Sequence, residues 1–190
     1  MSAANRGAER KKADFYETPF STIYALLNNY NGIKPNDLIL EPSAGSGNII
    51  KALRDFGHKN KIDAMEIREE EKQNIQFADN VFIDDFLTTN VLSKYDLIIG
   101  NPPYSLAKEF IDKSFELLKP DGKIIFLLRT NFLESQRRRD WWQDKIPSKL
   151  FVCAKRPSFT GKGTDATSYS WFIWEMNNGQ LKTGSEIKIV

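Results

Sequence analysis

The sequence predicts an α/β fold built on one doubly wound, mostly parallel sheet with helices on both faces. Short apolar runs of strand length alternate with helical patterns along most of the 190 residues, as in sheets with right-handed crossovers. Polar residues follow several of these runs directly, which is where ligands bind in such sheets. The last two runs are joined without a helical pattern, so we expect seven strands with the seventh antiparallel.

The first half of the chain predicts one helix and then three strands. We expect Thr18 to cap the helix and Pro19 to take its first position. Apolar residues then recur at helical spacing as far as Asn31. The segments expected to follow are strand 38–41, helix 47–56, strand 61–67, a charged helix from residue 69 and strand 80–83.

The second half continues the alternation. Ser105 is expected to cap a helix whose apolar stripe ends at Leu118, and residues 119–122 are expected to form a turn. Around this helix we expect strand 95–99, strand 123–128, helix 135–144, and the two final strands 149–154 and 169–174.

The turn after the first strand is rich in small residues. Gly45 and Gly47 would let the backbone approach a ligand closely. The dinucleotide-binding fingerprint needs a third glycine where Ile50 stands, so that pattern fails. Glu41 would repel a pyrophosphate, and its charge favours a cationic cofactor such as S-adenosylmethionine.

Carboxylates also end the second and third strands. Glu66 follows the first loop by about twenty residues, the spacing of a carboxylate that holds ribose hydroxyls. After strand 80–83, Asp85 is able to accept a hydrogen bond from an adenine amino group while Phe86 packs on the ring. The alternative is that Asp84 or Asp85 caps a turn.

Asn101-Pro102-Pro103-Tyr104 stands at the carboxyl end of a predicted buried strand. The Asn101 side-chain oxygen and the Pro102 carbonyl are able to accept hydrogen bonds from one amino group. The Tyr104 ring is able to lie flat against a planar system that carries that group. The alternative is a turn that merely ends the strand, since Asn and Pro favour turns.

The order of these motifs resembles that of the S-adenosylmethionine-dependent methyltransferases that modify amino groups. It is most similar to the DNA adenine-N6 methyltransferases of the Asn-Pro-Pro-Tyr type, and among them to a compact, prophage-like group. Residues 16–19 match the family's cofactor-contacting segment, and residues 156–159 resemble the loop whose aromatic ring stacks on a flipped base. The resemblance covers about residues 14–176 and implies the class I methyltransferase fold, a Rossmann-like sheet.

The resemblance implies a reaction and a set of site residues. A methyl group would move from S-adenosylmethionine to the exocyclic N6 amino group of adenine in DNA, by direct attack of a flipped or unpaired base. Neither a general base nor a metal is expected. The implied roles are catalytic for Asn101, Pro102, Pro103 and Tyr104, substrate-binding for Phe159 and Arg156, and cofactor-binding for Tyr16, Thr18, Pro19, Glu41, Pro42, Ser43, Ala44, Gly45, Gly47, Glu66, Ile67, Asp85, Phe86 and Asn101.

Three segments are expected along the chain. They are a disordered basic tail at residues 1–13, the methyltransferase domain at residues 14–176, and a turn with one short strand at residues 177–190. The adenine methyltransferases with this motif order usually add a target-recognition domain, and none is evident here. We therefore expect weak sequence specificity, with phosphate contacts supplying most of the affinity.

Three other functions remain open from the sequence. An RNA adenine methyltransferase would find its base already unstacked in a loop. A glutamine-N5 protein methyltransferase also carries Asn-Pro-Pro-Tyr, but that family usually has a helical N-terminal domain and an Asp-x-Gly loop. A degenerate cofactor-binding scaffold is the non-enzymatic alternative, and the intact Asn101 and Tyr104 argue against it.

Composition fits a small cytoplasmic protein and not one that spans a membrane, and the resemblance implies a nucleic-acid partner, with DNA favoured over RNA. One cysteine, Cys153, favours a reducing compartment, and no apolar run is long enough to span a bilayer. The net charge is only +2, but basic residues cluster at residues 137–139, next to Trp141 and Trp142, and again at 155–156. The alternative is that these arginines form a solvated helix face and the tryptophans belong to the core.

Overall fold

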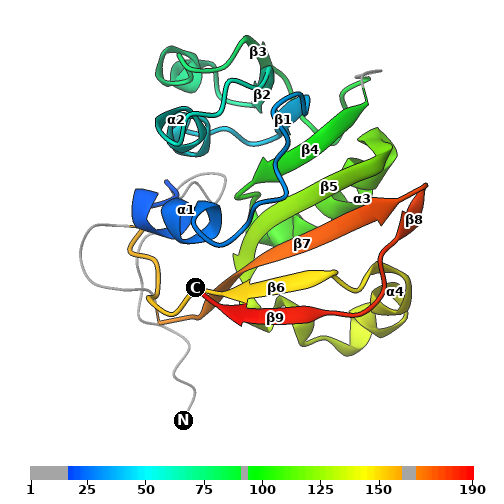
Figure 1. Cartoon of the computed structure of the whole chain (residues 1–190). Coiled ribbons are helices and arrows are strands. Elements are labelled where there is room, and N and C mark those ends of the chain that lie inside the picture. Colours follow the sequence, from blue (N-terminus) through cyan, green and yellow to red (C-terminus); the bar gives the residue numbers. More distant parts are fainter. Residues whose placement is uncertain (1–16, 91–93, 160–165) are drawn as a thin grey trace.

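The computed structural model of the chain describes residues 17–90, 94–159 and 166–190 (Figure 1). Tyr16 and the tail expected at residues 1–13 lie outside these described residues. Within them, none of the helices has the length and apolar character needed to cross a membrane.

One sheet runs through the molecule in the strand order β3-β2-β1-β4-β5-β7-β6-β9, with β8 paired to β7 (Figure 1). The strands β3, β2, β1, β4 and β5 are parallel to one another. Strand β7 is antiparallel to both β5 and β6. The bounds are β1 (Ile39–Glu41), β2 (Ile62–Glu66), β3 (Asn80–Ile83), β4 (Tyr95–Gly100), β5 (Leu118–Arg129), β6 (Lys149–Val152), β7 (Tyr169–Asn177), β8 (Gln180–Leu181) and β9 (Glu186–Ile189).

The predicted fold class is confirmed. The seven expected strands form a mostly parallel sheet, and the seventh, β7, is antiparallel as the missing crossover helix required. Two short strands extend this sheet. β8 pairs with the end of β7, and β9, the short strand expected near the carboxyl terminus, pairs in parallel with β6.

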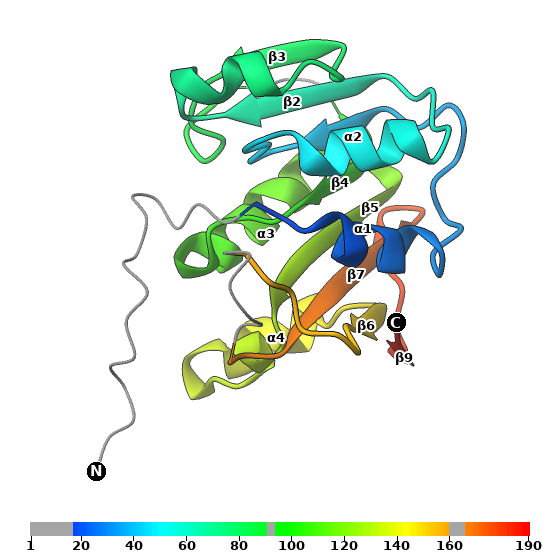
Figure 2. The same cartoon turned by 90° about the vertical axis from the view of Figure 1, so that its left-hand side faces the viewer.

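Helices cover both faces of the sheet, α1 and α2 on one side and α3 and α4 on the other (Figures 1 and 2). The helices and 3-10 segments are α1 (Phe20–Leu27), α2 (Asn48–Asp55), η2 (Glu69–Asn74), η3 (Tyr104–Leu106), α3 (Ala107–Leu117), η4 (Thr130–Leu133), η5 (Gln136–Arg138) and α4 (Arg139–Lys145).

Several local predictions were wrong. The charged segment after β2 forms the 3-10 helix η2, because none of its residues is buried and no apolar face ties it to the sheet. Pro19 occupies the N-cap of α1 in place of Thr18, and no side chain caps that helix. Ser105 lies inside η3, so α3 begins later than expected, with Leu106 at its N-cap.

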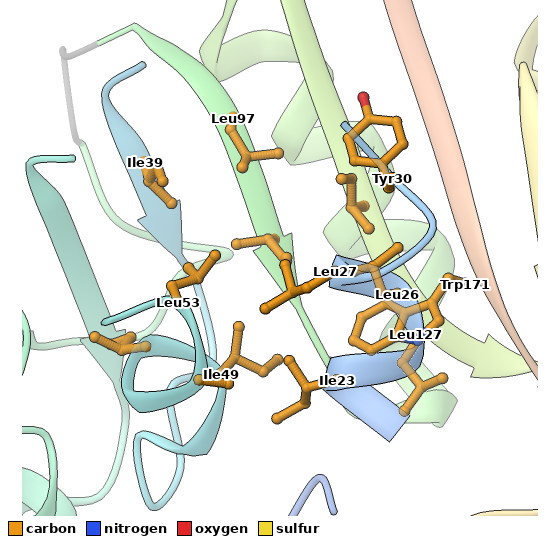
Figure 3. Packing of buried hydrophobic residues seen from close by; sticks show 14 of the residues in the cluster. Ile23, Leu26, Leu27, Tyr30, Ile39, Ile49, Leu53, Leu97, Leu127 and Trp171 are labelled. Atoms are coloured by element: carbon orange, nitrogen blue, oxygen red, sulfur yellow. The ribbon is translucent and has the colours of Figure 1, made fainter. Parts of the chain in front are cut away.

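Helix α1 is fixed to the sheet by fully buried apolar side chains. Ile23 and Leu26 pack beside Trp171 of β7 and Leu127 of β5 (Figure 3). The Trp171 indole Nε1 donates a hydrogen bond of 3.1 Å to the Thr22 carbonyl. This docking determines where the preceding residues 17–19 run, and they lead to the carboxyl edge of the sheet.

We expect the substitution Leu26→Ala to lower the free energy of unfolding by about 2–5 kcal/mol. The side chain is 0% exposed, so its removal leaves a cavity between α1 and the sheet. Urea denaturation measures the loss, and the exposed Ser21→Ala in the same helix is the control, with an expected change below about 0.5 kcal/mol. Equal stabilities of Leu26→Ala and wild type would contradict this account of α1.

Candidate active site

The predicted site residues meet at one edge of the sheet because parallel strands end on the same side. Glu41 ends β1, Glu66 ends β2, and Asn101 follows β4 directly. A pocket of about 160 Å³ lies there. Its lining consists of Glu17, Thr18, Glu41, Pro42, Ser43, Ala44, Gly45, Ser46, Asn48, Ile49, Glu66, Ile67, Arg68, Asp84, Asp85, Phe86, Asn101, Pro103, Leu106 and Phe110.

The turn between β1 and α2 uses its glycines in two different ways. Gly45 has a φ of 55° and lines the pocket. Gly47 has a φ of 75°, immediately before α2, and does not line the pocket. A Cβ atom on Gly47 would lie 3.0 Å from the Asn74 carbonyl oxygen. Gly47 is therefore required by the turn and by the close approach of residues 74–75.

Glu66 links the first two strand ends. Its carboxylate accepts hydrogen bonds from the Gly45 backbone at 2.8 Å and from the Arg68 backbone at 3.1 Å. The Arg68 guanidinium donates a further bond of 2.8 Å from Nε. The carboxylate is almost completely buried. These contacts fix its orientation at the wall of the pocket.

Glu41 is the most deeply buried acid of the pocket, with 2% of its surface exposed. Its Oε2 atom accepts no hydrogen bond from any residue that the structure describes. Burial, and then the nearby charge of Glu66, raise the pKa of the Glu41 carboxyl well above its usual range, while a hydrogen bond from the Ile50 backbone acts in the opposite direction.

The buried Glu41 carboxylate suits a ligand with positive charge, because its Oε2 atom would gain the partner that the described residues do not supply. S-adenosylmethionine, with its ammonium and sulfonium groups, fits this acidic wall. The described residues hold no group of three or more His, Cys, Asp or Glu side chains that could bind a metal ion.

The residues after β3 form a turn and also line one wall of the pocket. Asp85 Oδ1 accepts a hydrogen bond of 2.9 Å from the Leu87 backbone, so the turn-capping alternative is correct for this residue. Asp85 also lines the pocket, beside Phe86, whose ring centroid is 5.0 Å from that of Phe110. Ile67 is 60% exposed on the same wall. An apolar surface of this kind beside a carboxylate fits a nucleobase ring.

Asn101 is bonded to Thr18, which is bonded in turn to the start of α2. Its Nδ2 atom donates a hydrogen bond of 3.0 Å to the Thr18 hydroxyl. The Asn48 side chain, at the start of α2, donates one of 3.1 Å to the Thr18 carbonyl. Pro102 is buried and Pro103 lines the pocket. The amide therefore lies between the pocket and the aromatic residues that follow.

An aromatic cluster continues the site beyond Asn101. Tyr104 and Phe159 both contact Tyr169 at the start of β7, with ring centroids 5.6 and 5.1 Å from it. The Arg129 guanidinium lies 5.1 Å from the Tyr104 ring centroid and its Nε donates a hydrogen bond of 3.4 Å to the Tyr169 hydroxyl. Arg156 is exposed and bonds to the Ala166 carbonyl at 3.4 Å. Tyr169 thus joins Tyr104 and Phe159 in one aromatic cluster.

The structure brings most of the predicted residues together. Of those that it describes, Pro19, Gly47, Pro102, Tyr104, Arg156 and Phe159 do not line the pocket. Sequence reasoning missed Asn48, Arg68, Leu106 and Phe110 in the pocket, and Arg129 and Tyr169 beside Tyr104. Leu106 and Phe110 belong to a stripe that predicts core packing, so their pattern carries no signal for a site. Arg68 stands two residues after Glu66, and this closeness in sequence to a predicted site residue could have pointed to it.

The chain is similar in sequence to curated methyltransferases, although no protein-family model matches it. It is 28% identical over 159 residues to the Type II methyltransferase M.AccI of Acinetobacter calcoaceticus, covering 66% of this chain and 29% of the relative. It is 32% identical over 98 residues to the Type II methyltransferase M.CvrRI of Paramecium bursaria Chlorella virus XZ-6E, covering 50% and 26%. The chain thus spans less than a third of either relative.

Solved structures with similar folds are methyltransferases too. The M protein of the type I restriction enzyme EcoKI matches with a TM-score of 0.66 and 14% identity, over 87% of this chain and 45% of that one. A candidate class I S-adenosylmethionine-dependent methyltransferase from Listeria monocytogenes matches at 0.64 with 16% identity, over 90% and 62%. A candidate RNA methyltransferase from Pyrococcus horikoshii matches at 0.63 with 17% identity, over 86% and 87%. These similarities confirm the class I methyltransferase fold, and with the sequence relatives they confirm the predicted resemblance to methyltransferases.

We expect Glu41→Gln to stabilise the ligand-free protein at neutral pH by about 1–3 kcal/mol, because it removes a buried charge whose Oε2 atom accepts no hydrogen bond from the described residues. A raised pKa means that the folded state keeps a proton which the unfolded state releases. The stability of the wild type therefore falls as the pH rises from the ordinary carboxyl pKa toward the raised one.

Urea unfolding of wild type and Glu41→Gln at about pH 4 and at neutral pH measures this difference, which should be small at the lower pH. The exposed Glu70→Gln is the control and should change little at either pH. A Glu41→Gln protein that is less stable than wild type at neutral pH would show that the Glu41 charge is well compensated.

Proposed function

We propose that this chain, which has the class I methyltransferase fold and resembles Type II methyltransferases in sequence, transfers a methyl group to the N6 amino group of adenine in DNA. S-adenosylmethionine, the cofactor that we assign to the pocket, supplies the methyl group from its sulfonium. One observation carries the proposal. The amide of Asn101 lines the same pocket as Glu41 and Glu66, so an amino group held there would adjoin the cofactor.

The pocket residues divide the cofactor between them. Glu66 and Asp85 are the carboxylates for the ribose hydroxyls and the adenine amino group, and Ile67 offers an exposed apolar surface to the ring. Glu41 is the carboxylate for the positively charged methionine end of S-adenosylmethionine. The backbone of residues 42–46 supplies the close approach that the φ of Gly45 permits.

Asn101 and Pro102 act on the target amine. The lone pair of an exocyclic amine is delocalised into the ring, so the group is a weak nucleophile. Acceptance of its two N–H bonds by Asn101 Oδ1 and the Pro102 carbonyl would favour a pyramidal nitrogen. The lone pair then points at the methyl group, and positioning supplies most of the rate. The amine becomes acidic only once it is methylated, so no base has to remove a proton before transfer.

The aromatic cluster is the place for the target base. Tyr104 follows the two prolines. Its ring contacts Tyr169, and the Phe159 ring contacts Tyr169 as well. Two rings on either side of a flat base would each contribute stacking energy of about 1–3 kcal/mol. A base in a duplex would have to leave the stack to arrive there.

Exposed basic residues support a nucleic acid as substrate. Arg137, Arg139, Lys155 and Arg156 are exposed and form no ion pair with the residues described. Arg138 differs from its neighbours, because it donates a hydrogen bond of 2.6 Å to the Phe132 carbonyl and stacks on that ring. These exposed cations follow β5 and β6 in the chain, whereas the acids of the pocket follow β1 to β3. Phosphates would meet these cations.

RNA is the second candidate substrate, and the similarity to an RNA methyltransferase fold supports it as a fold-level analogy only. Methylation of a glutamine side chain has no further support among the site residues. The single cysteine, Cys153, which is buried, supports a cytoplasmic location for the protein as part of this proposal.

Labelled methyl transfer to a panel of substrates tests the proposal. The panel holds single-stranded DNA, duplex DNA, tRNA, rRNA and a release factor, and the modified product is identified after digestion. We expect N6-methyladenine in DNA, with transfer that weakens as salt rises because phosphate contacts supply most of the affinity. Modified adenine in RNA alone, or a methylated protein, would overturn the choice of substrate.

We expect Asn101→Ala to bind S-adenosylmethionine normally and to lose at least about 100-fold in the rate of transfer, because its side chain acts on the reacting amine. Calorimetry gives the affinity and single-turnover kinetics give the rate. Asn36→Ala, an exposed asparagine in the turn before β1, is the matched control. Transfer by Asn101→Ala within a few-fold of wild type would reduce residues 101–104 to a turn without a chemical role.

A further inference from the structure

Thr18 connects the pocket to the end of β4, although it is 83 residues from Asn101 in the sequence. Its hydroxyl accepts the hydrogen bond from Asn101 Nδ2, and its carbonyl accepts the one from Asn48 Nδ2. The residue is only 5% exposed, so water competes little for the hydroxyl. Its position is thus fixed from α2, and it contacts the amide that we assign to the target amine.

The hydrogen bond from Asn101 to Thr18, beside the side-chain hydrogen bond between Asn101 and Tyr104, favours one orientation of the Asn101 amide. A carboxamide carries its donors on one branch and its acceptor on the other, and rotation by half a turn exchanges them. Because Nδ2 is directed at Thr18 Oγ1, Oδ1 lies on the opposite branch. Only the oxygen is able to accept from an amino group, and an amide in the exchanged orientation would set N–H against N–H.

We propose that Thr18 is a positioning residue for methyl transfer, whose hydroxyl holds the Asn101 amide with its oxygen available to the target amine. The inference rests on the proposed function of Asn101. It gives the Thr18 hydroxyl a task separate from the cofactor contact expected of residues 16–19, because the hydroxyl contacts the Asn101 amide.

The local sequence leaves the Thr18 hydroxyl available for this task. A threonine just before a helix ordinarily bonds to the backbone of the first turn. In this chain Pro19 occupies the N-cap of α1, and no side-chain cap is present. Proline also restricts the residue before it to an extended backbone. The hydroxyl is therefore not used by α1 and reaches Asn101.

Three variants of Thr18 separate the hydroxyl from the rest of the side chain. Thr18→Val keeps the shape and removes the acceptor, Thr18→Ala removes it without added bulk, and Thr18→Ser keeps it. Thr22→Val is the matched control, because Thr22 is also a buried threonine of this region and does not line the pocket.

The first measurement does not depend on activity. Solvent exchange of the Asn101 side-chain amide protons is followed by NMR in the ligand-free protein. We expect exchange about 5- to 10-fold faster in Thr18→Val and Thr18→Ala than in wild type, as the loss of one hydrogen bond predicts. Thr18→Ser and Thr22→Val should exchange like wild type. Equal exchange rates in Thr18→Val and wild type would overturn the proposal even if the enzyme methylates DNA.

The second measurement follows the reaction on whichever substrate of the panel accepts the methyl group. Thr18→Val and Thr18→Ala should lose about 10- to 100-fold in kcat at saturating cofactor, because the amide is misplaced, and calorimetry measures any change in cofactor affinity separately. Thr18→Ser should recover most of the rate. A loss of cofactor affinity without a loss of kcat would make Thr18 a cofactor contact only.

The two measurements separate this inference from the proposed function. If wild type methylates nothing in the panel, the proposed function fails, and the amide exchange rates still decide whether Thr18 holds Asn101. If DNA is methylated but the kcat of Thr18→Val equals that of wild type, the function stands and Thr18 has no positioning role.

Discussion

The alignment of four parallel strands is the constraint on which the site depends. Strands β2, β1 and β4 run side by side in one direction, and β3 pairs with β2 at the edge of the sheet. The carboxyl ends of all four strands therefore bring residues far apart in sequence to one side. Each strand end then contributes a group of a different kind: a buried acid after β1, an acid bound by backbone and guanidinium after β2, a turn acid after β3 and an amide after β4. Docking of α1 adds the N-terminal segment to the same edge.

Charge is divided along this edge. The acids Glu41, Glu66 and Asp85 gather over β1 to β3, and exposed cations follow β5 and β6. A cationic cofactor suits the first half and a phosphate backbone suits the second, because buried charges need partners and exposed cations bind polyanions. Asn101 and Tyr104 follow β4, between the two halves. The proposed reaction would therefore take place where the acidic half meets the basic half.

The sequence predicts the fold and much of the pocket because these depend on local patterns. Apolar strands end in a polar residue at Glu41, Glu66 and Asn101, and the missing helix before β7 predicts its direction. Thr18 shows where such reasoning stops, because a helix cap is the local use of that residue and its actual partner is 83 residues away. Arg129 and Tyr169 face each other across β5 and β7, and register of this kind cannot be derived from either strand alone. The prediction of an α-helix at η2 was wrong for a simpler reason. The charge pattern of this segment is helical, but no buried apolar side chain holds it to the sheet.

A crystal structure of the protein with an unreactive amino analogue of S-adenosylmethionine and a short adenine-containing DNA is the most direct test of the central claim. We predict that the adenine N6 atom donates to Asn101 Oδ1 and the Pro102 carbonyl and lies about 3–3.5 Å from the atom that replaces the methyl group. The ribose should contact Glu66, and the target base should lie beside Tyr104. A cofactor bound outside the pocket, or an adenine whose amino group points away from Asn101, would contradict the account.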